Sequence, residues 1–103
     1  MYKVLKRDGI TVEFDISKIS AAMIKAFEAQ GRNYHTSVIN MLALQVTSDF
    51  EPKIKNDLIA VEDIQDSVEK VLSAAGYADI AKAYILYRKQ REKVRNVNSA
   101  LLN

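Results

Sequence analysis

The sequence predicts an α+β fold, a four-helix bundle capped by a small three-stranded β-sheet, on three observations. The dipeptide Asp8-Gly9 separates two short β-rich runs, which is a strong short-range signal of a hairpin. Later segments carry apolar residues at the spacing of amphipathic helices, and the short run 58–61 reads as a third strand. Because a hairpin and a lone strand cannot bury two sheet faces, the sheet is expected to pack on the helices.

The hairpin is expected to use residues 2–7 and 10–16 as its strands. With a two-residue turn, Leu5 faces Val12 across the hairpin, and one face of the hairpin covers the core. That face consists of Leu5, Ile10, Val12 and Phe14, and the opposite face of Val4, Lys6, Thr11, Glu13 and Asp15. A bulged turn would shift this pairing. In either case Lys6 and Arg7 lie beside the turn and give the hairpin a cationic tip.

The helix boundaries follow from caps and breakers. Ser17 is expected as the N-cap of a first helix that ends at Gly31, and Thr36 or Ser37 as the N-cap of a second that ends before Pro52. A third helix follows the strand 58–61 and stops at Gly76, and a fourth runs from about residue 77 to 95. Residues 1–95 are expected to form one domain, and residues 96–103 a linker toward further chain. The apolar positions expected in the helices are Ile16, Ile19, Met23, Ala26, Phe27, Val38, Leu42, Val46, Phe50, Val61, Ile64, Val68, Val71, Leu72, Ala75, Ile80, Ala81, Tyr84, Ile85 and Tyr87.

The composition excludes several classes of protein. A chain of 103 residues suffices for one core, and the absence of cysteine excludes a disulfide framework, a cysteine zinc site and thiol catalysis. No apolar run is long enough to span a membrane, and the first residues lack a secretory signal, so a cytoplasmic location is expected. The single histidine, His35, is expected at the surface or as a cap. Because no P-loop, dinucleotide fingerprint or Ser/His/Asp set occurs, the chain is predicted to be a binding module and not an enzyme.

The charges are unevenly distributed along the chain. Residues 49–69 are rich in acids, and residues 82–95 carry the bases Lys82, Arg88, Lys89, Arg91, Lys93 and Arg95 against Glu92 alone. Tyr84, Tyr87, Arg88 and Arg91 share one stripe of the fourth helix. Two interpretations of this stripe stay open: the tyrosines pack in the bundle while the arginines pair with the acidic helix, or the arginines bind phosphates. In the second, Lys6, Arg7 and Lys18 approach the same anion.

Several segments together resemble the ATP-cone, the regulatory nucleotide-binding domain of ribonucleotide reductases and of their transcriptional repressor. The matching segments are 4–9, 12–15 with Lys18-Ile19, 61–69, Gly76-Tyr77, and 81–88 with Arg91, and the resemblance covers about residues 2–92. The resemblance implies the same fold, with the hairpin closing over a bound ATP or dATP. Mg²⁺ is expected to accompany the nucleotide, because that ion usually takes only one or two carboxylates and can be held through the phosphates. The resemblance also implies a regulatory role: ATP favours and dATP shuts down a catalytic domain of the same polypeptide, through oligomeric state or substrate access.

The resemblance, together with the arginine stripe, gives a set of expected ligand contacts and no catalytic or metal-ligand residue. The expected phosphate contacts are Lys6, Arg7, Lys18, Arg88 and Arg91, and the expected nucleoside contacts are Val4, Val12, Asp15, Val61 and Gln65. Within the family, the segment 95–102 looks like the exit from the cone of an anaerobic (class III) ribonucleoside-triphosphate reductase. The repressor would carry a cysteine-containing zinc ribbon before its cone, and this chain has no cysteine.

Other interpretations belong to different classes of protein. A repressor cone is one, and a nucleic-acid-binding module that uses residues 82–95 as a basic helix is another, although no DNA- or RNA-recognition signature accompanies the charge. A purely structural oligomerisation domain is a third. Neither a membrane nor a nucleic acid is the expected partner.

Overall fold

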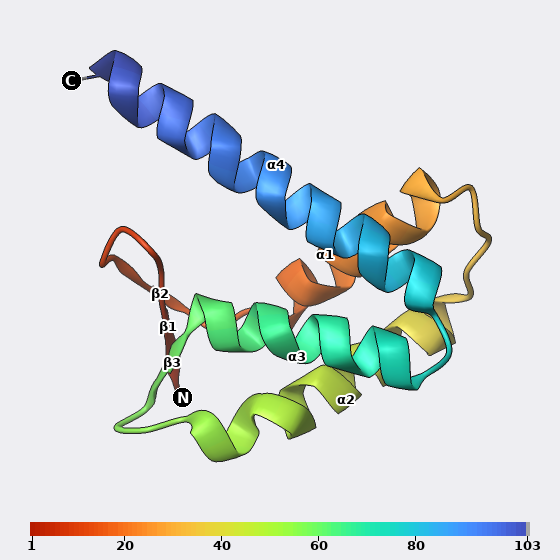
Figure 1. Cartoon of the computed structure of the whole chain (residues 1–103). Helices are drawn as coiled ribbons and strands as arrows, with labels where there is room; N and C mark the ends of the chain where they lie inside the picture. The colour runs from red at the N-terminus through yellow and green to blue at the C-terminus, as the bar shows by residue number, and fades with distance from the viewer. Residues whose placement is uncertain (103) are drawn as a thin grey trace.

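The computed structural model describes the backbone of residues 1–102 and the side chains of residues 1–94, and it confirms the predicted α+β class. The elements are β1 (Lys3–Leu5), β2 (Thr11–Glu13), α1 (Ile16–Ala29), α2 (Thr36–Phe50), a 3₁₀ turn (Glu51–Lys53), β3 (Leu58–Ala60), α3 (Val61–Ala74) and α4 (Ala78–Leu102). The sheet has the order β2-β1-β3, with β1 antiparallel to β2 and parallel to β3. It lies at one end of the helices, and the C-terminal half of α4 extends beyond them (Figure 1).

The hairpin differs from the prediction by one residue. Val4, not Leu5, pairs with Val12, so the two-residue turn is wrong and the register is shifted, as the alternative of a bulged turn allowed. The backbone N–H of Gly9 donates to the Lys6 carbonyl (3.0 Å) and that of Lys6 to the Ile10 carbonyl (2.8 Å), which gives a three-residue loop. Gly9 has φ +86°, the left-handed conformation that ends such a loop.

This shift moves a different side chain onto the core. Val4 is buried, with 7% of its surface exposed, whereas Ile10 at the tip is 58% exposed. The prediction that Leu5 and Ile10 cover the core is therefore wrong. Val12 and Phe14 do pack against the core, as predicted.

Two helix caps also lie earlier than predicted. Asp15 is the N-cap of α1, and its Oδ1 accepts hydrogen bonds from the backbone N–H (3.0 Å) and the hydroxyl (2.6 Å) of Ser17. His35 caps α2, with its Nδ1 accepting from the backbone N–H of Ser37 (3.2 Å). A carboxylate or an imidazole nitrogen two residues before the expected hydroxyl reaches the same free N–H groups. The prediction of a cap at Ser17, and at Thr36 or Ser37, is thus wrong by one or two positions.

Helix α4 runs past its predicted end at residue 95 to Leu102, because neither glycine nor proline interrupts it. Asn103 lies outside the described residues. That residues 96–103 connect the domain to further chain stays a prediction.

The core joins the sheet to the bundle through aromatic contacts. The rings of Tyr2, Phe14 and Phe50 lie with centroids 4.7–6.1 Å apart, so the hairpin is anchored on the end of α2. At the other end of the bundle, Phe27 and Tyr77 pack edge to face with centroids 5.2 Å apart. In the part of the chain that the structure describes, no helix is both long and apolar enough to cross a membrane.

Candidate functional site

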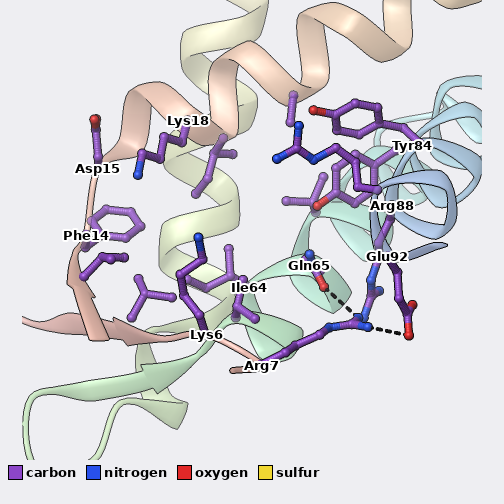
Figure 2. A pocket seen from close by; sticks show the side chains of 18 of the residues that line it. Lys6, Arg7, Phe14, Asp15, Lys18, Ile64, Gln65, Tyr84, Arg88 and Glu92 are labelled. Atoms are coloured by element: carbon purple, nitrogen blue, oxygen red, sulfur yellow. Dashed lines mark hydrogen bonds and ion pairs between the residues drawn. The ribbon is translucent and has the colours of Figure 1, made fainter. Parts of the chain in front are cut away.

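A cavity of about 260 Å³ lies between the hairpin, α1, α3 and α4. Every residue predicted to contact phosphate or nucleoside lines it: Val4, Lys6, Arg7, Val12, Asp15, Lys18, Val61, Gln65, Arg88 and Arg91. Figure 2 shows Lys6 from the hairpin and Lys18 from α1 pointing into the same space. Residues far apart in the sequence therefore meet at one site.

The sheet places these residues. The first strand supplies Val4 to the core and is followed by Lys6, which lines the cavity. Because β1 pairs with β3 in parallel, and α3 follows β3 without a connecting loop, the first turns of α3 lie beside the hairpin. Those turns carry Val61 and Gln65. The N-cap Asp15 fixes the start of α1, and Lys18 follows one turn later.

The wall of the cavity is apolar between its charged ends. It includes Phe14, Ile19, Ile64 and Val68, all of which pack in or against the core. Tyr84 also lines it and is only 5% exposed. The Tyr84 phenol is uncharged at neutral pH, and burial raises its pKa further, from 10.0 to about 12.

The two arginines of the α4 stripe have different surroundings. Arg88 donates to Glu69 (2.7 Å) and to Asp66 (3.2 Å), both on α3. Burial lowers the pKa of the Arg88 guanidinium, but these hydrogen bonds outweigh it and raise that pKa overall. Arg91 lies over the ring of Tyr87, 5.9 Å from its centroid. Arg88 therefore follows the first interpretation, in which the arginines pair with the acidic helix. Arg91 lines the cavity, where its guanidinium can bind an anion.

Among the described side chains, Lys6, Lys18 and Arg91 form no ion pair with a carboxylate. All three line the cavity, from the hairpin, from α1 and from α4 respectively. Unpaired cations that converge on one concave surface concentrate anions there. The cavity is thus suited to a ligand with several negative charges and an apolar body.

Arg7 is held differently from these cations. Its guanidinium lies 3.3 Å from Glu62 of α3 and 2.7 Å from Glu92 of α4, and it donates to the amide oxygen of Gln65 (3.4 Å). Figure 2 shows the side chain extending away from Lys6 toward Gln65 and Glu92. The cationic tip of the hairpin is therefore tied to both helices.

Several residues of the cavity were not predicted from the sequence as ligand contacts, notably Glu92, Glu13 and Phe14. A signal for Glu92 was present, because it is the sole acid in a strongly basic segment. Glu13 and Phe14 gave no comparable signal: an alternating strand predicts an outward acid and an inward aromatic ring whether or not a cavity lies beside them.

The basic residues of α4 do not form one surface. Lys82, Lys89 and Lys93 are exposed and, at spacings of seven and four, share a face of the helix. Arg88 and Arg91 instead line the cavity. Within the described residues no group of three or more histidine, cysteine or acidic side chains is placed to hold a metal ion.

Comparison with known proteins gives the same family as the resemblance. The family model described as the ATP cone domain matches residues 2–93. The chain is 44% identical over 98 residues to the ribonucleoside-diphosphate reductase subunit alpha of Chlamydia pneumoniae, covering 89% of this chain and 9% of that protein. It is 36% identical over 99 residues to the vitamin B12-dependent ribonucleoside-diphosphate reductase of Mycobacterium tuberculosis, covering 96% and 14%. It is 32% identical over 118 residues to the anaerobic ribonucleoside-triphosphate reductase of Salmonella typhimurium, covering 97% and 16%. The chain thus spans only a small part of the length of each of these relatives.

Proposed function

The chain belongs to the ATP-cone family, and from that premise we propose that its cavity binds ATP or dATP as a regulatory ligand. The observation that carries the proposal is the convergence of Lys6, Lys18 and Arg91 on one cavity, each without a carboxylate partner among the described side chains. A triphosphate supplies the several negative charges that such a group accepts. Arg7 and Arg88 would join it by exchanging part of their present carboxylate contacts for phosphate.

The nucleoside would occupy the apolar side of the cavity. Val4, Val12 and Val61 offer flat aliphatic surface, and Asp15 and Gln65 are the polar groups beside it. ATP and dATP differ by one ribose hydroxyl, and a single hydrogen bond to it contributes on the order of 1 kcal/mol net. That difference can switch an enzyme when the two ligands stabilise different arrangements of the whole protein.

Mg²⁺ would reach the site with the nucleotide. The ion usually keeps several waters and takes only one or two carboxylates together with phosphate oxygens. The carboxylates that line the cavity are Glu13, Asp15 and Glu92, and each already has a partner, since Glu13 pairs with Lys3, Asp15 caps α1 and Glu92 pairs with Arg7. These residues fit an ion carried by phosphates better than one held by the protein alone.

The regulated activity is proposed to be that of a ribonucleotide reductase joined to this domain, since the relatives named above are such enzymes. ATP would favour and dATP inhibit that activity, through oligomeric state or substrate access. These relatives include reductases of several kinds, so the finer proposal of an anaerobic reductase rests on the exit segment 95–102 alone. It is tested by the coding sequence that continues after residue 103, which should encode the catalytic part of an anaerobic enzyme.

Calorimetric titration of the domain with dATP, ATP and GTP, each with and without Mg²⁺, tests the binding. A saturable heat of binding with both adenine nucleotides, and no heat of binding with GTP, supports the proposal. The stoichiometry gives the number of nucleotides bound per domain. No heat and no thermal stabilisation with any of the three would refute it. Salt-dependent duplex DNA binding that ATP does not compete would favour the nucleic-acid interpretation.

Substitution of the free cations tests the location of the site. Lys6→Ala or Arg91→Ala should weaken ATP binding by about tenfold or more, because each removes a charge-assisted contact to phosphate. The melting temperature should stay close to that of the unmodified domain, since neither side chain is buried in the core. Lys89→Ala is the matched control, an exposed cation on another face of α4. Unchanged affinity in both cavity variants would refute the assignment.

A further inference from the structure

Arg7 lines the cavity and joins the hairpin to α3 and α4. Its guanidinium meets Glu92 at 2.7 Å, Glu62 at 3.3 Å and Gln65 at 3.4 Å, although the loop that carries it belongs to neither helix. The Arg7 side chain is 26% exposed, whereas Glu62 and Glu92 are 45% and 46% exposed. The three partners thus hold the arginine at the surface, within reach of both solvent and cavity.

These contacts compete with an anion for the same donors. A guanidinium has five N–H donors in a planar fork, and carboxylates and phosphates approach it in the same way. Each N–H that donates to Glu62 or Glu92 is not available to a phosphate in the cavity that Arg7 also lines. The three nitrogens of the Arg7 guanidinium each have a partner, so a triphosphate that binds through the N–H groups facing Glu62 or Glu92 has to displace that carboxylate.

We propose that Glu92, with Glu62, acts as an internal counter-ion that holds the hairpin tip closed in the empty domain and sets the nucleotide affinity. This inference rests on the proposed function and adds a residue to it: Glu92 lowers affinity by competing for Arg7. The ligand must carry enough negative charge to replace the carboxylates, which favours a polyphosphate over a neutral nucleoside. The contact is ionic and partly exposed, so it opens easily and weakens with salt.

The first test uses the empty domain and needs no nucleotide. Trypsin cleaves the bond after Arg7 only when the arginine has left its partners and can enter the protease. Glu92→Gln should therefore speed cleavage at this bond by roughly two- to fivefold, the range expected from losing one exposed ion pair. Mass spectrometry separates this cut from cleavage after Lys6. Glu13→Gln is the matched control, because Glu13 also lines the cavity and also loses an exposed ion pair, the one with Lys3, but does not contact Arg7.

The second test measures ATP affinity in the same variants. Glu92→Gln should bind ATP more tightly than Glu13→Gln by roughly two- to fivefold, although both remove one negative charge from the cavity. In an Arg7→Gln background, Glu92→Gln should increase ATP affinity no more than Glu13→Gln does. Without the Arg7 guanidinium, Glu92 and the phosphates no longer compete for the same donors.

The outcomes separate the two proposals. Equal tryptic rates in Glu92→Gln, Glu13→Gln and the unmodified domain would overturn the closed tip. Weaker ATP binding by Glu92→Gln would also overturn the inference, and would indicate a carboxylate that helps to bind the ligand; a loss seen only with Mg²⁺ present would assign that help to the ion. If no nucleotide binds the unmodified domain, the proposed function fails, and the tryptic comparison still decides whether Glu92 holds the tip.

Discussion

Tyr84 shows how one side chain serves both core and cavity. The ring is buried in the bundle, yet it also lines the cavity, and burial raises the pKa of its phenol to about 12 from an ordinary value of 10.0. Between these two values the unfolded chain loses the phenolic proton while the folded chain keeps it. The contribution of Tyr84 to stability is therefore complete below pH 10 and is lost as the pH rises toward 12.

Tyr84→Phe tests this dependence. The free energy of unfolding of the variant should fall less steeply than that of the unmodified domain between pH 10 and 12, because phenylalanine has no proton to release. Urea denaturation at several pH values measures both slopes. Below pH 10 the difference between the two proteins should be constant. Parallel curves up to pH 12 would show that the phenol ionises as readily in the folded as in the unfolded chain.

Residue types at the positions that match the family could predict the cations of the candidate site but not their ion pairing. Lysine and arginine at the matching positions were enough to name Lys6, Lys18 and Arg91, and the structure brings all three to one cavity. The partners of Arg7 and Arg88 depend on which helix faces each guanidinium, which is a property of the packing. From the sequence, pairing of the α4 arginines with the acidic helix was one of two open interpretations, beside phosphate binding. Nothing in the sequence indicated that Glu92 would form an ion pair with Arg7.

At the scale of elements, a buried hydroxyl links α2 to α3. Ser67 is 1% exposed, and its Oγ donates to Asp49 Oδ2 at 2.7 Å. This hydrogen bond is the largest cause that lowers the pKa of the Asp49 carboxyl, and Lys70 lowers it further. A lowered pKa means that the contribution to stability is present above the ordinary value of 3.8 and is lost as the pH falls through the folded-state value.

Ser67→Ala should lower the free energy of unfolding at pH 7 by about 1–2 kcal/mol, because a charge-assisted hydrogen bond between two helices is lost. The loss should shrink below pH 4, where the carboxyl is protonated in the unfolded chain. Ser73→Ala, an exposed serine on the same helix, is the control and should have little effect. A loss that does not depend on pH would show that packing of the buried serine, not its bond to Asp49, stabilises the pair of helices.

The hairpin marks the limit of predicting elements from their pattern. Asp8-Gly9 predicted the turn, but a two-residue and a three-residue loop share that dipeptide and differ by one in register. Packing decides between them: the observed register buries Val4 and leaves Ile10 exposed at the tip. The errors in the helices had smaller consequences. Their apolar patterns are longer, and a cap displaced by one or two residues leaves the buried face of the helix unchanged.

At the scale of the whole molecule, the cavity joins every element except α2, the 3₁₀ turn and β3. The hairpin, α1, α3 and α4 all contribute to its lining, and α2 packs on the side away from it. A ligand that binds only the folded state stabilises that state by about 2.7 kcal/mol at a hundred times its dissociation constant. The elements that it joins should gain local protection beyond this global effect.

Hydrogen exchange with and without ATP tests this distribution. Protection should increase in the hairpin, in the first turns of α1 and α3, and around Arg88 and Arg91 in α4. Exchange from the middle of α2 should change only where it reports global unfolding. Protection confined to α2, or absent everywhere at saturating ATP, would contradict a ligand bound in this cavity.

The parallel pairing of β1 with β3 has a consequence for the order in which the molecule assembles. Lys3 lies opposite Leu58. The central strand β1 therefore pairs with β3, a strand that is synthesised only after α1 and α2. Such long-range pairings close large loops and form late in folding. The hairpin can form early from its own residues, but its place beside α3 depends on this late step. The cavity is therefore among the last parts of the molecule to form, because its lining is complete only after α4 has been synthesised.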